Sequence, residues 1–278
     1  MGNRRLRLRE VARDWLGVLL SVALIALVYL LPPDTSLSLV QQAGVLRVCV
    51  PTRYPPLVTG NPDAPGIDVE IVHAVARRLG VRVQLNPSSA MGLDWNPRQW
   101  RLTRAQCQLI AGGVVDTETT RSFLDVSPSY LETGWALVAR ETPASFAGLT
   151  VGVYAGVPGL DRVALSRFLR GQGATVAVVS SAAELERGLL AGRFAAAVTE
   201  ALIARQMAYD IGWTAVWLPE PMPRYGIALG LWRGDTTLKR AVVRALEDVE
   251  RSGELADILR RYELAPIGEF CADCGAAI

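Results

Sequence analysis

The sequence predicts an α/β protein in which two similar units stand side by side, preceded by one N-terminal transmembrane helix. Short apolar runs rich in valine alternate with stretches whose apolar residues recur at helical spacing. Proline and glycine end several of these segments. In α/β units, ligands bind beyond the carboxyl ends of the strands, so two facing units would form a ligand-binding cleft.

The first unit begins with a strand, a helix and a second strand in succession. Its predicted strands lie at residues 45–50, 81–85, 107–115 and 134–140. A helix begins at Gly66-Ile67-Asp68 and ends at Gly80, with apolar residues recurring on one face. This order of elements is typical of a parallel α/β layer.

The second unit begins at about residue 147 and repeats the pattern. A strand followed by a glycine turn occupies residues 148–156, and further strands are predicted at 194–200 and 225–232. A capping box from Ser181 to Glu184 starts a helix between the first two of these strands. Two helices, separated by Ser252-Gly253, close the unit.

The N-terminus combines a basic segment with an uncharged apolar stretch. The basic residues are Arg4, Arg5, Arg7, Arg9 and Arg13, within a tail of residues 1–14. Residues 15–31 follow, and as a helix they would span roughly 25 Å, with Trp15 and Tyr29 at the two membrane interfaces. Arginines favour the cytoplasmic side, which places the rest of the chain in the periplasm.

A cleaved signal peptide is the alternative interpretation of this segment. Signal cleavage needs small residues just after the apolar region, and here the chain continues PPDTSLSL. We therefore expect residues 15–31 to remain as a single-pass inner-membrane anchor, followed by a tether at residues 32–43.

Charge, histidine and cysteine content argue against several functional classes. The chain carries 29 basic and 27 acidic residues, and its basic residues cluster only at the N-terminus, which is no nucleic-acid footprint. His73 is the single histidine and is predicted on a helix surface. The motif Cys271-Ala-Asp-Cys274 alone lacks the ligands of a structural zinc site. We predict no metal site, no cofactor and no catalytic residue.

Ten short motifs follow one another along about 220 residues. They are Gly44-Val-Leu-Arg-Val, Tyr54-Pro55-Pro56, Gly66-Ile67-Asp68, Leu79-Gly80-Val81, Asp125 to Tyr130, Gly148-Leu-Thr-Val-Gly-Val, Ala191-Gly192-Arg193, Tyr225-Gly226-Ile227, Gly253-Glu-Leu and Arg261-Tyr262. This ordered series resembles the extracytoplasmic solute-binding proteins of ABC importers, family 3, which bind amino acids and have the type II periplasmic-binding fold.

The resemblance implies a discontinuous first lobe and a hinge. Lobe 1 would comprise residues 44–140 together with 226–265, and lobe 2 residues 141–225. The chain would cross between the lobes twice. Residues 266–278 would form a C-terminal tail that carries the CxxC motif.

The resemblance also implies a set of ligand-binding residues. Arg121 would hold the carboxylate of a bound amino acid, since a guanidinium matches a carboxylate bidentately. Tyr54 would flank the ligand, and Glu200 would meet its amino group. The sequence departs from the family where Gly112, Gly113 and Val114 replace hydroxyl residues, and where Val157 follows a glycine in the second lobe. The alternative for Arg121 is a structural ion pair with Asp125 or Glu118.

The cysteines resemble those of a subgroup encoded beside quinoprotein dehydrogenases. Cys49 and Cys107 lie on strands that neighbour each other in the family's sheet, so the resemblance implies a disulfide between them. Cys271 and Cys274 would then pair locally or stay reduced.

Three functions are compatible with these observations. The first is a membrane-anchored periplasmic protein that captures an amino-acid-like or carboxylate solute between two lobes, for import through an ABC permease. The second is an accessory subunit that keeps the fold, docks on another integral membrane complex and has a degenerate pocket. The third is a dehydratase-like enzyme, known for a few relatives of the fold. We expect the protein not to be an enzyme.

Overall fold

The computed structural model describes residues 15, 18–23, 34–91, 97–155 and 160–264. The chain divides into two compact units, Met1–Thr35 and Ser36–Ile278. In the first unit, the described residues Trp15 and 18–23 are helical. None of the helices in the described part of the chain has both the length and the hydropathy of a membrane span. The predicted anchor therefore lies largely outside the described residues.

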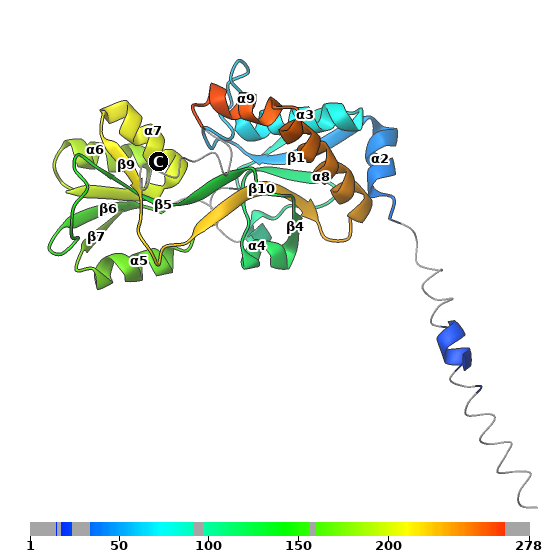
Figure 1. The fold of residues 1–278 in the computed structure, drawn as a ribbon, viewed down its shortest axis with the longest axis horizontal. Helices are drawn as coiled ribbons and strands as arrows, with labels where there is room; N and C mark the ends of the chain where they lie inside the picture. Colours follow the sequence, from blue (N-terminus) through cyan, green and yellow to red (C-terminus); the bar gives the residue numbers. More distant parts are fainter. Residues whose placement is uncertain (1–14, 16–17, 24–33, 92–96, 156–159, 265–278) are drawn as a thin grey trace, which may run out of the picture. The chain divides into compact units, whose positions relative to one another are not determined.

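The second unit contains two α/β lobes (Figure 1). Lobe 1 contains α2 (Ser36–Ala43), β1 (Val45–Pro51), α3 (Ile67–Leu79), β2 (Arg82–Ser88), η1 (Pro97–Trp100), β3 (Leu109–Val115), α4 (Glu118–Phe123), β4 (Leu124–Val126), α8 (Thr236–Arg251) and α9 (Glu254–Arg261). Lobe 2 contains β6 (Thr150–Tyr154), α5 (Arg162–Gly171), β7 (Thr175–Val179), α6 (Ala182–Leu190), β8 (Ala196–Glu200), α7 (Ala201–Ile211) and β9 (Thr214–Trp217). The expected strand–helix alternation is confirmed in both lobes.

Two long strands connect the lobes: β5 (Leu131–Ala139) and β10 (Arg224–Trp232). The first half of β5 pairs with β10, and its second half, from Trp135 on, pairs with β8 and β9. The change from one lobe's sheet to the other therefore falls inside β5, whereas the sequence puts the boundary after residue 140. A continuous extended strand gives no sequence signal where its pairing partners change.

Parallel strands form the centre of each lobe. In lobe 1, β1 pairs in parallel with β2 and β3, and in lobe 2, β6 pairs in parallel with β7 and β8. Apolar faces of α3, α8 and α9 bury against the first sheet, with Ile67, Ile71 and Leu246 in that core. The carboxyl ends of the strands lead to the loops between the lobes, which positions the candidate site.

The predicted tether contains a helix that packs on lobe 1. Helix α2 buries Val40, and the Ser36 hydroxyl lies 3.0 Å from the Thr237 hydroxyl at the start of α8. The backbone N–H of Leu37 also donates to Thr237 at 3.2 Å. Residues 36–43 are therefore joined to lobe 1 by apolar burial and by hydrogen bonds.

Asp68 holds the end of β3 in place from the first turn of α3. Its Oδ2 accepts hydrogen bonds from the backbone N–H groups of Gly112 at 2.5 Å and Gly113 at 3.0 Å. Both glycines have positive φ, 94° and 89°, which side chains rarely allow. Burial raises the pKa of Asp68 to about 6, although the Gly113 amide lowers it. The buried carboxylate thus fixes the backbone that leads into the space between the lobes.

A disulfide joins Cys49 of β1 to Cys107, just before β3, with their Cα atoms 5.5 Å apart. Both cysteines are buried in a cluster that includes Trp100 and Trp232. The indole N–H of Trp232 donates to the Cys107 carbonyl at 2.7 Å. The predicted disulfide is confirmed, whereas Cys271 and Cys274 lie outside the described residues.

We predict that Cys49→Ser with Cys107→Ser lowers the free energy of unfolding by about 4 kcal/mol. The bridge joins residues 58 apart, and cross-linking a loop of this length restricts the unfolded chain by roughly that amount. Urea unfolding without reductant measures the loss. Cys271→Ser with Cys274→Ser is the matched control, and an equal loss in that control would contradict the prediction.

We also predict a pH dependence carried by Asp68. Burial holds its folded pKa at about 6, above the ordinary value of 3.8, so its contribution to stability is fully present below pH 3.8 and is lost as pH rises through 6. The free energy of unfolding of the native chain, minus that of Asp68→Asn, should fall by about 2 kcal/mol between pH 4 and 7, since a full shift of one pKa unit corresponds to about 1.36 kcal/mol. Urea unfolding at successive pH values measures this difference, and a difference that rises with pH would refute it.

Candidate functional site

The cleft expected between two facing α/β units is present as cavities lined from both lobes. The larger one, which we call the α4/α5 cavity, has a volume of about 790 Å³. Lobe 1 contributes Asp116 to Thr119, at the end of β3 and start of α4, and lobe 2 contributes Asp161 to Val163 at the start of α5. Tyr225 of the connecting strand β10 completes it. A solute in this cavity would touch both lobes.

Both helix starts at this cavity are capped by side chains of the chain itself. The Thr117 hydroxyl accepts from the Thr120 backbone N–H at 3.1 Å. Asp161 Oδ1 accepts from the N–H groups of Val163 and Ala164, each at 2.9 Å. These amide donors are therefore already engaged, so a bound anion would have to compete with the caps.

Arg121 forms a bidentate ion pair with Asp116. Its Nε donates to Oδ1 at 2.5 Å and its Nη2 to Oδ2 at 2.7 Å, while its side chain is 63% exposed. Hydrogen bonding to Asp116 raises the pKa of Arg121 further. The sequence had suggested Asp125 or Glu118 as the ion-pair partner of Arg121. Asp125 instead pairs with Lys239 at 3.3 Å. The partner is Asp116, which directly follows β3 and lies five residues before Arg121 of α4.

Tyr54 and Gly113 lie in contact. A Cβ on Gly113 would come within 2.6 Å of the Tyr54 ring, and one on Gly112 within 2.2 Å of Pro51. The resemblance led us to expect hydroxyl side chains at these two positions. The glycines instead leave that space to the rings of Tyr54 and Pro51. Val114, the third residue of this series, is fully buried in the core around the disulfide.

Glu200 is a completely buried carboxylate at the end of β8. Its Oε2 accepts from the Ile203 N–H at 3.1 Å and so caps α7, and its Oε1 accepts from the Thr133 hydroxyl of β5. Tyr54 of lobe 1 also hydrogen-bonds to it. Burial raises the pKa of Glu200, and these hydrogen bonds lower it. Burial, and then Glu200, raise the pKa of Tyr54 well above its usual value.

The structure therefore brings together some of the residues predicted from the sequence. Tyr54, Glu200 and the glycine pair meet between the lobes, while Arg121 lies on the exposed side of α4 and Val114 in the core. Val157 lies outside the described residues. The sequence carries no signal for Thr133, which lies 67 residues from Glu200. Asp116 is only five residues from Arg121, but the ion pair was expected with Asp125 or Glu118 instead.

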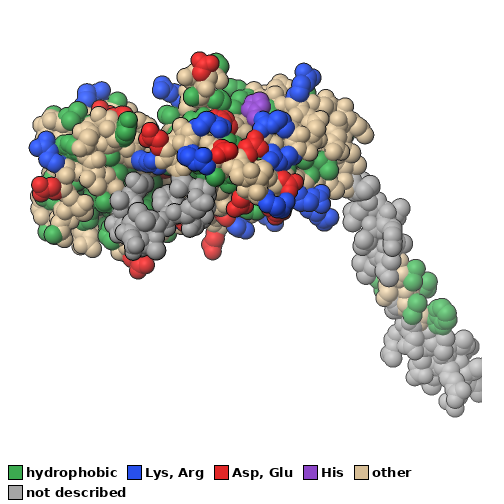
Figure 2. Space-filling model, turned by 45° about the horizontal axis from the view of Figure 1, so that its top comes forward, with side chains coloured by type: hydrophobic (Ala, Val, Ile, Leu, Met, Phe, Trp, Pro, Cys, Tyr) green, Lys and Arg blue, Asp and Glu red, His purple; other side chains and the backbone are tan. Residues whose placement is uncertain are grey.

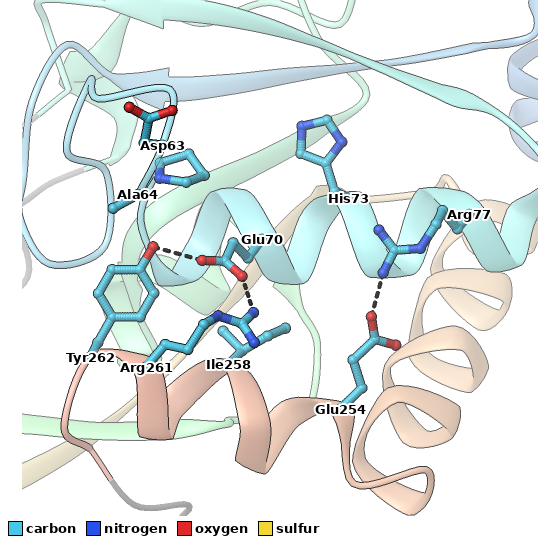
Figure 3. A pocket seen from close by; sticks show the side chains of 10 residues that line it. Asp63, Ala64, Glu70, His73, Arg77, Glu254, Ile258, Arg261 and Tyr262 are labelled. Atoms are coloured by element: carbon cyan, nitrogen blue, oxygen red, sulfur yellow. Dashed lines mark hydrogen bonds and ion pairs between the residues drawn. The ribbon is translucent and has the colours of Figure 1, made fainter.

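A further cavity, of about 620 Å³, lies on lobe 1 between α3 and α9 (Figure 3). Glu70 accepts from the Tyr262 hydroxyl at 2.7 Å and pairs with Arg261, and Arg77 pairs with Glu254. Acidic and basic side chains are interspersed over this face of the molecule (Figure 2). These pairs tie α9 to α3. The exposed His73 lies on this helix surface, as predicted.

Comparison with known proteins agrees with the two-lobe fold. The L-cystine-binding protein TcyJ of Escherichia coli strain K12 is 24% identical over 270 residues, covering 92% of this chain and 97% of that protein. Two solved structures cover most of the chain. The ancestral amino acid-binding protein AncCDT-1, a precursor of cyclohexadienyl dehydratase, is 20% identical with a TM-score of 0.64 and covers 82% of this chain and 98% of its own. The binding protein AbpA of Streptococcus pneumoniae, bound to L-arginine, is 19% identical with a TM-score of 0.62, covering 81% and 96%.

The family assignment rests on a match over most of the chain. Residues 46–265 match the model of the bacterial extracellular solute-binding proteins, family 3, a range that includes both lobes and both connecting strands. The chain belongs to family 3 of the bacterial extracellular solute-binding proteins.

Proposed function

We propose that the protein captures a small amino-acid-like solute between its two lobes and delivers it to the permease of an ABC importer. The observation that carries the proposal is the presence of cavities between the lobes whose walls come from both lobes: the α4/α5 cavity, and a second one lined by Tyr54 of lobe 1 and Tyr154 of lobe 2. A solute that contacts both lobes binds the closed form more tightly than the open form, and this difference drives closure. The names of TcyJ and AbpA support an amino acid as the solute, and both support binding over catalysis.

The ligand-binding roles of the predicted residues stay predictions within this proposal. Tyr54 has support, because it lies between the lobes and lines a cavity there. For Arg121 to bind a carboxylate, Asp116 must first release it. For Glu200 to meet an amino group, its buried hydrogen bonds with Thr133 and Tyr54 must rearrange.

We predict that at least one amino acid stabilises the protein. A ligand that binds only the folded state at one hundred times its Kd adds about 2.7 kcal/mol to the free energy of unfolding. The full chain in detergent is screened by thermal denaturation against the common L-amino acids, L-cystine and small dicarboxylates. Calorimetry then measures the Kd of each compound that raises the melting temperature. A folded protein that binds none of them would contradict the proposed function.

A second candidate is an accessory subunit of a membrane enzyme complex that keeps the fold as a scaffold, as in the subgroup encoded beside quinoprotein dehydrogenases. The observation that favours it is that polar groups between the lobes already bind one another. Arg121 forms an ion pair with Asp116, and both carboxylate oxygens of Glu200 accept hydrogen bonds from this chain. This candidate gains support only if the folded protein binds no solute in the screen above.

We further propose that residues 15–31 anchor the protein in the inner membrane, with the lobes in the periplasm. The support is the uncharged stretch behind five arginines, without small residues at a cleavage position.

We predict that the mature protein retains residues 1–31 and fractionates with the membrane, because the segment offers no cleavage site. Intact-mass analysis of membrane-extracted protein checks this. Leu30→Ala with Pro32→Ala is the matched control, since it introduces a small-x-small pattern and should release a shortened soluble chain. A native chain that begins near residue 35 would show that the segment is a cleaved signal.

A further inference from the structure

A second cavity between the lobes has a volume of about 350 Å³. We call it the tyrosine cavity. Arg53 and Tyr54, in the loop after β1, line it from lobe 1, and Tyr154 at the end of β6 lines it from lobe 2. The start of α6 and one face of α7 complete the lobe 2 side. Its volume falls within the range of small-molecule sites.

The walls of the tyrosine cavity are aromatic and apolar at their centre. Tyr54 and Tyr154 contribute one ring from each lobe. Ile203 and the buried Met207 of α7 line the cavity beside two alanines of α6. Such a surface favours an apolar or aromatic group and disfavours an unpaired charge.

Opposite charges lie at the two sides of this cavity. Arg53 stands on lobe 1, while Glu186 of α6 and Asp210 of α7 stand on lobe 2. Within the described part of the chain, the side chains of Arg53 and Glu186 make no hydrogen bond or ion pair, and Asp210 accepts a hydrogen bond from Gln206 at 2.8 Å. A zwitterion offers a carboxylate to the arginine and an ammonium to the acids.

The α4/α5 cavity offers less to a carboxylate. Asp116 already engages Arg121, and Thr117 and Asp161 cap the two helix starts. Glu118 adds a further acidic group to that lining. Arg162 also lines that cavity, but beside the three acidic residues Asp116, Glu118 and Asp161. Arg53 lines the tyrosine cavity with two acidic residues, and its guanidinium, unlike that of Arg121, is not held by an aspartate.

We propose that the tyrosine cavity binds an α-amino acid with an apolar or aromatic side chain. This inference rests on the proposed function and names the solute class and the end of the interlobe space that holds it. Arg53 binds the carboxylate, Glu186 and Asp210 bind the ammonium group, and the side chain packs between Tyr54 and Tyr154. Amino acids with a second carboxylate bind more weakly, because that charge meets apolar walls.

The test is calorimetry on the full chain in detergent with L-phenylalanine, L-methionine, L-glutamate and phenethylamine. We expect the first two to bind and L-glutamate to bind at least tenfold more weakly. Arg53→Ala should weaken binding of L-phenylalanine at least tenfold, and Glu186→Gln should weaken it as well. Arg82→Ala, at an exposed arginine of β2, is the matched control and should leave the Kd within twofold.

Phenethylamine, which lacks the carboxylate, isolates the proposed contact. It should bind the native chain at least tenfold more weakly than L-phenylalanine does, and Arg53→Ala should not weaken it further. Arg53 is exposed, so the melting temperature of the variant should match that of the native chain and exclude a folding defect.

Three outcomes overturn the inference. If Arg121→Ala weakens binding tenfold while Arg53→Ala does not, the carboxylate binds at the other end of the interlobe space. If L-glutamate or another charged amino acid binds more tightly than L-phenylalanine, the solute class is wrong and the proposed function stands. If the folded native chain binds no amino acid in the wider screen, the proposed function fails and this inference fails with it.

Discussion

Strand β5 is the constraint on which the arrangement of the two lobes depends. It pairs with β10 through residues 131–134 and with β8 and β9 through residues 135–139, so one extended segment belongs to both sheets. Thr133, on this strand, hydrogen-bonds to the buried Glu200 of lobe 2. A strand shared in this way keeps the carboxyl ends of β3 and β6 facing one another, because each sheet is fixed to the same backbone. The interlobe cavities follow from this arrangement.

The polar groups between the lobes are largely satisfied within the chain. Asp68 binds the glycine amides at the end of β3, Glu200 joins α7, β5 and Tyr54, and Asp116 binds Arg121. Leaving a buried polar group without a partner costs about 1–3 kcal/mol, so these contacts stabilise the form described. A solute that binds through the same groups must form contacts at least as favourable as the ones it replaces. A solute that uses unengaged groups avoids that competition, which favours Arg53 and Glu186.

Surface ion pairs on lobe 1 serve a different purpose from the groups in the interlobe space. Glu70 binds Arg261 and Tyr262, and Arg77 and Arg78 bind Glu254. Pairs at such exposure contribute at most about 1 kcal/mol each, but here they connect α3 to α9, between residues 176 to 192 positions apart. Helix α9, which completes the discontinuous lobe 1, is held to α3 by these pairs and by the apolar core beneath them.

The sequence by itself determined the α/β class, the main strands of both lobes and the start and end of α3, and its resemblance to a known family implied the two-lobe division and the Cys49–Cys107 pairing. The strands and α3 depend on local signals, such as helical spacing and the glycine after Leu79, whereas the lobes and the disulfide were implied by the ordered series of motifs. Tertiary structure alone decided where the side chains of Arg121, Tyr54 and Glu200 lie. Their surroundings come from distant segments: Tyr54 reaches Glu200 across 146 positions, and Thr133 reaches it from the shared strand. Tertiary structure likewise decided which half of β5 joins which sheet, because an extended strand has the same local sequence pattern in either lobe.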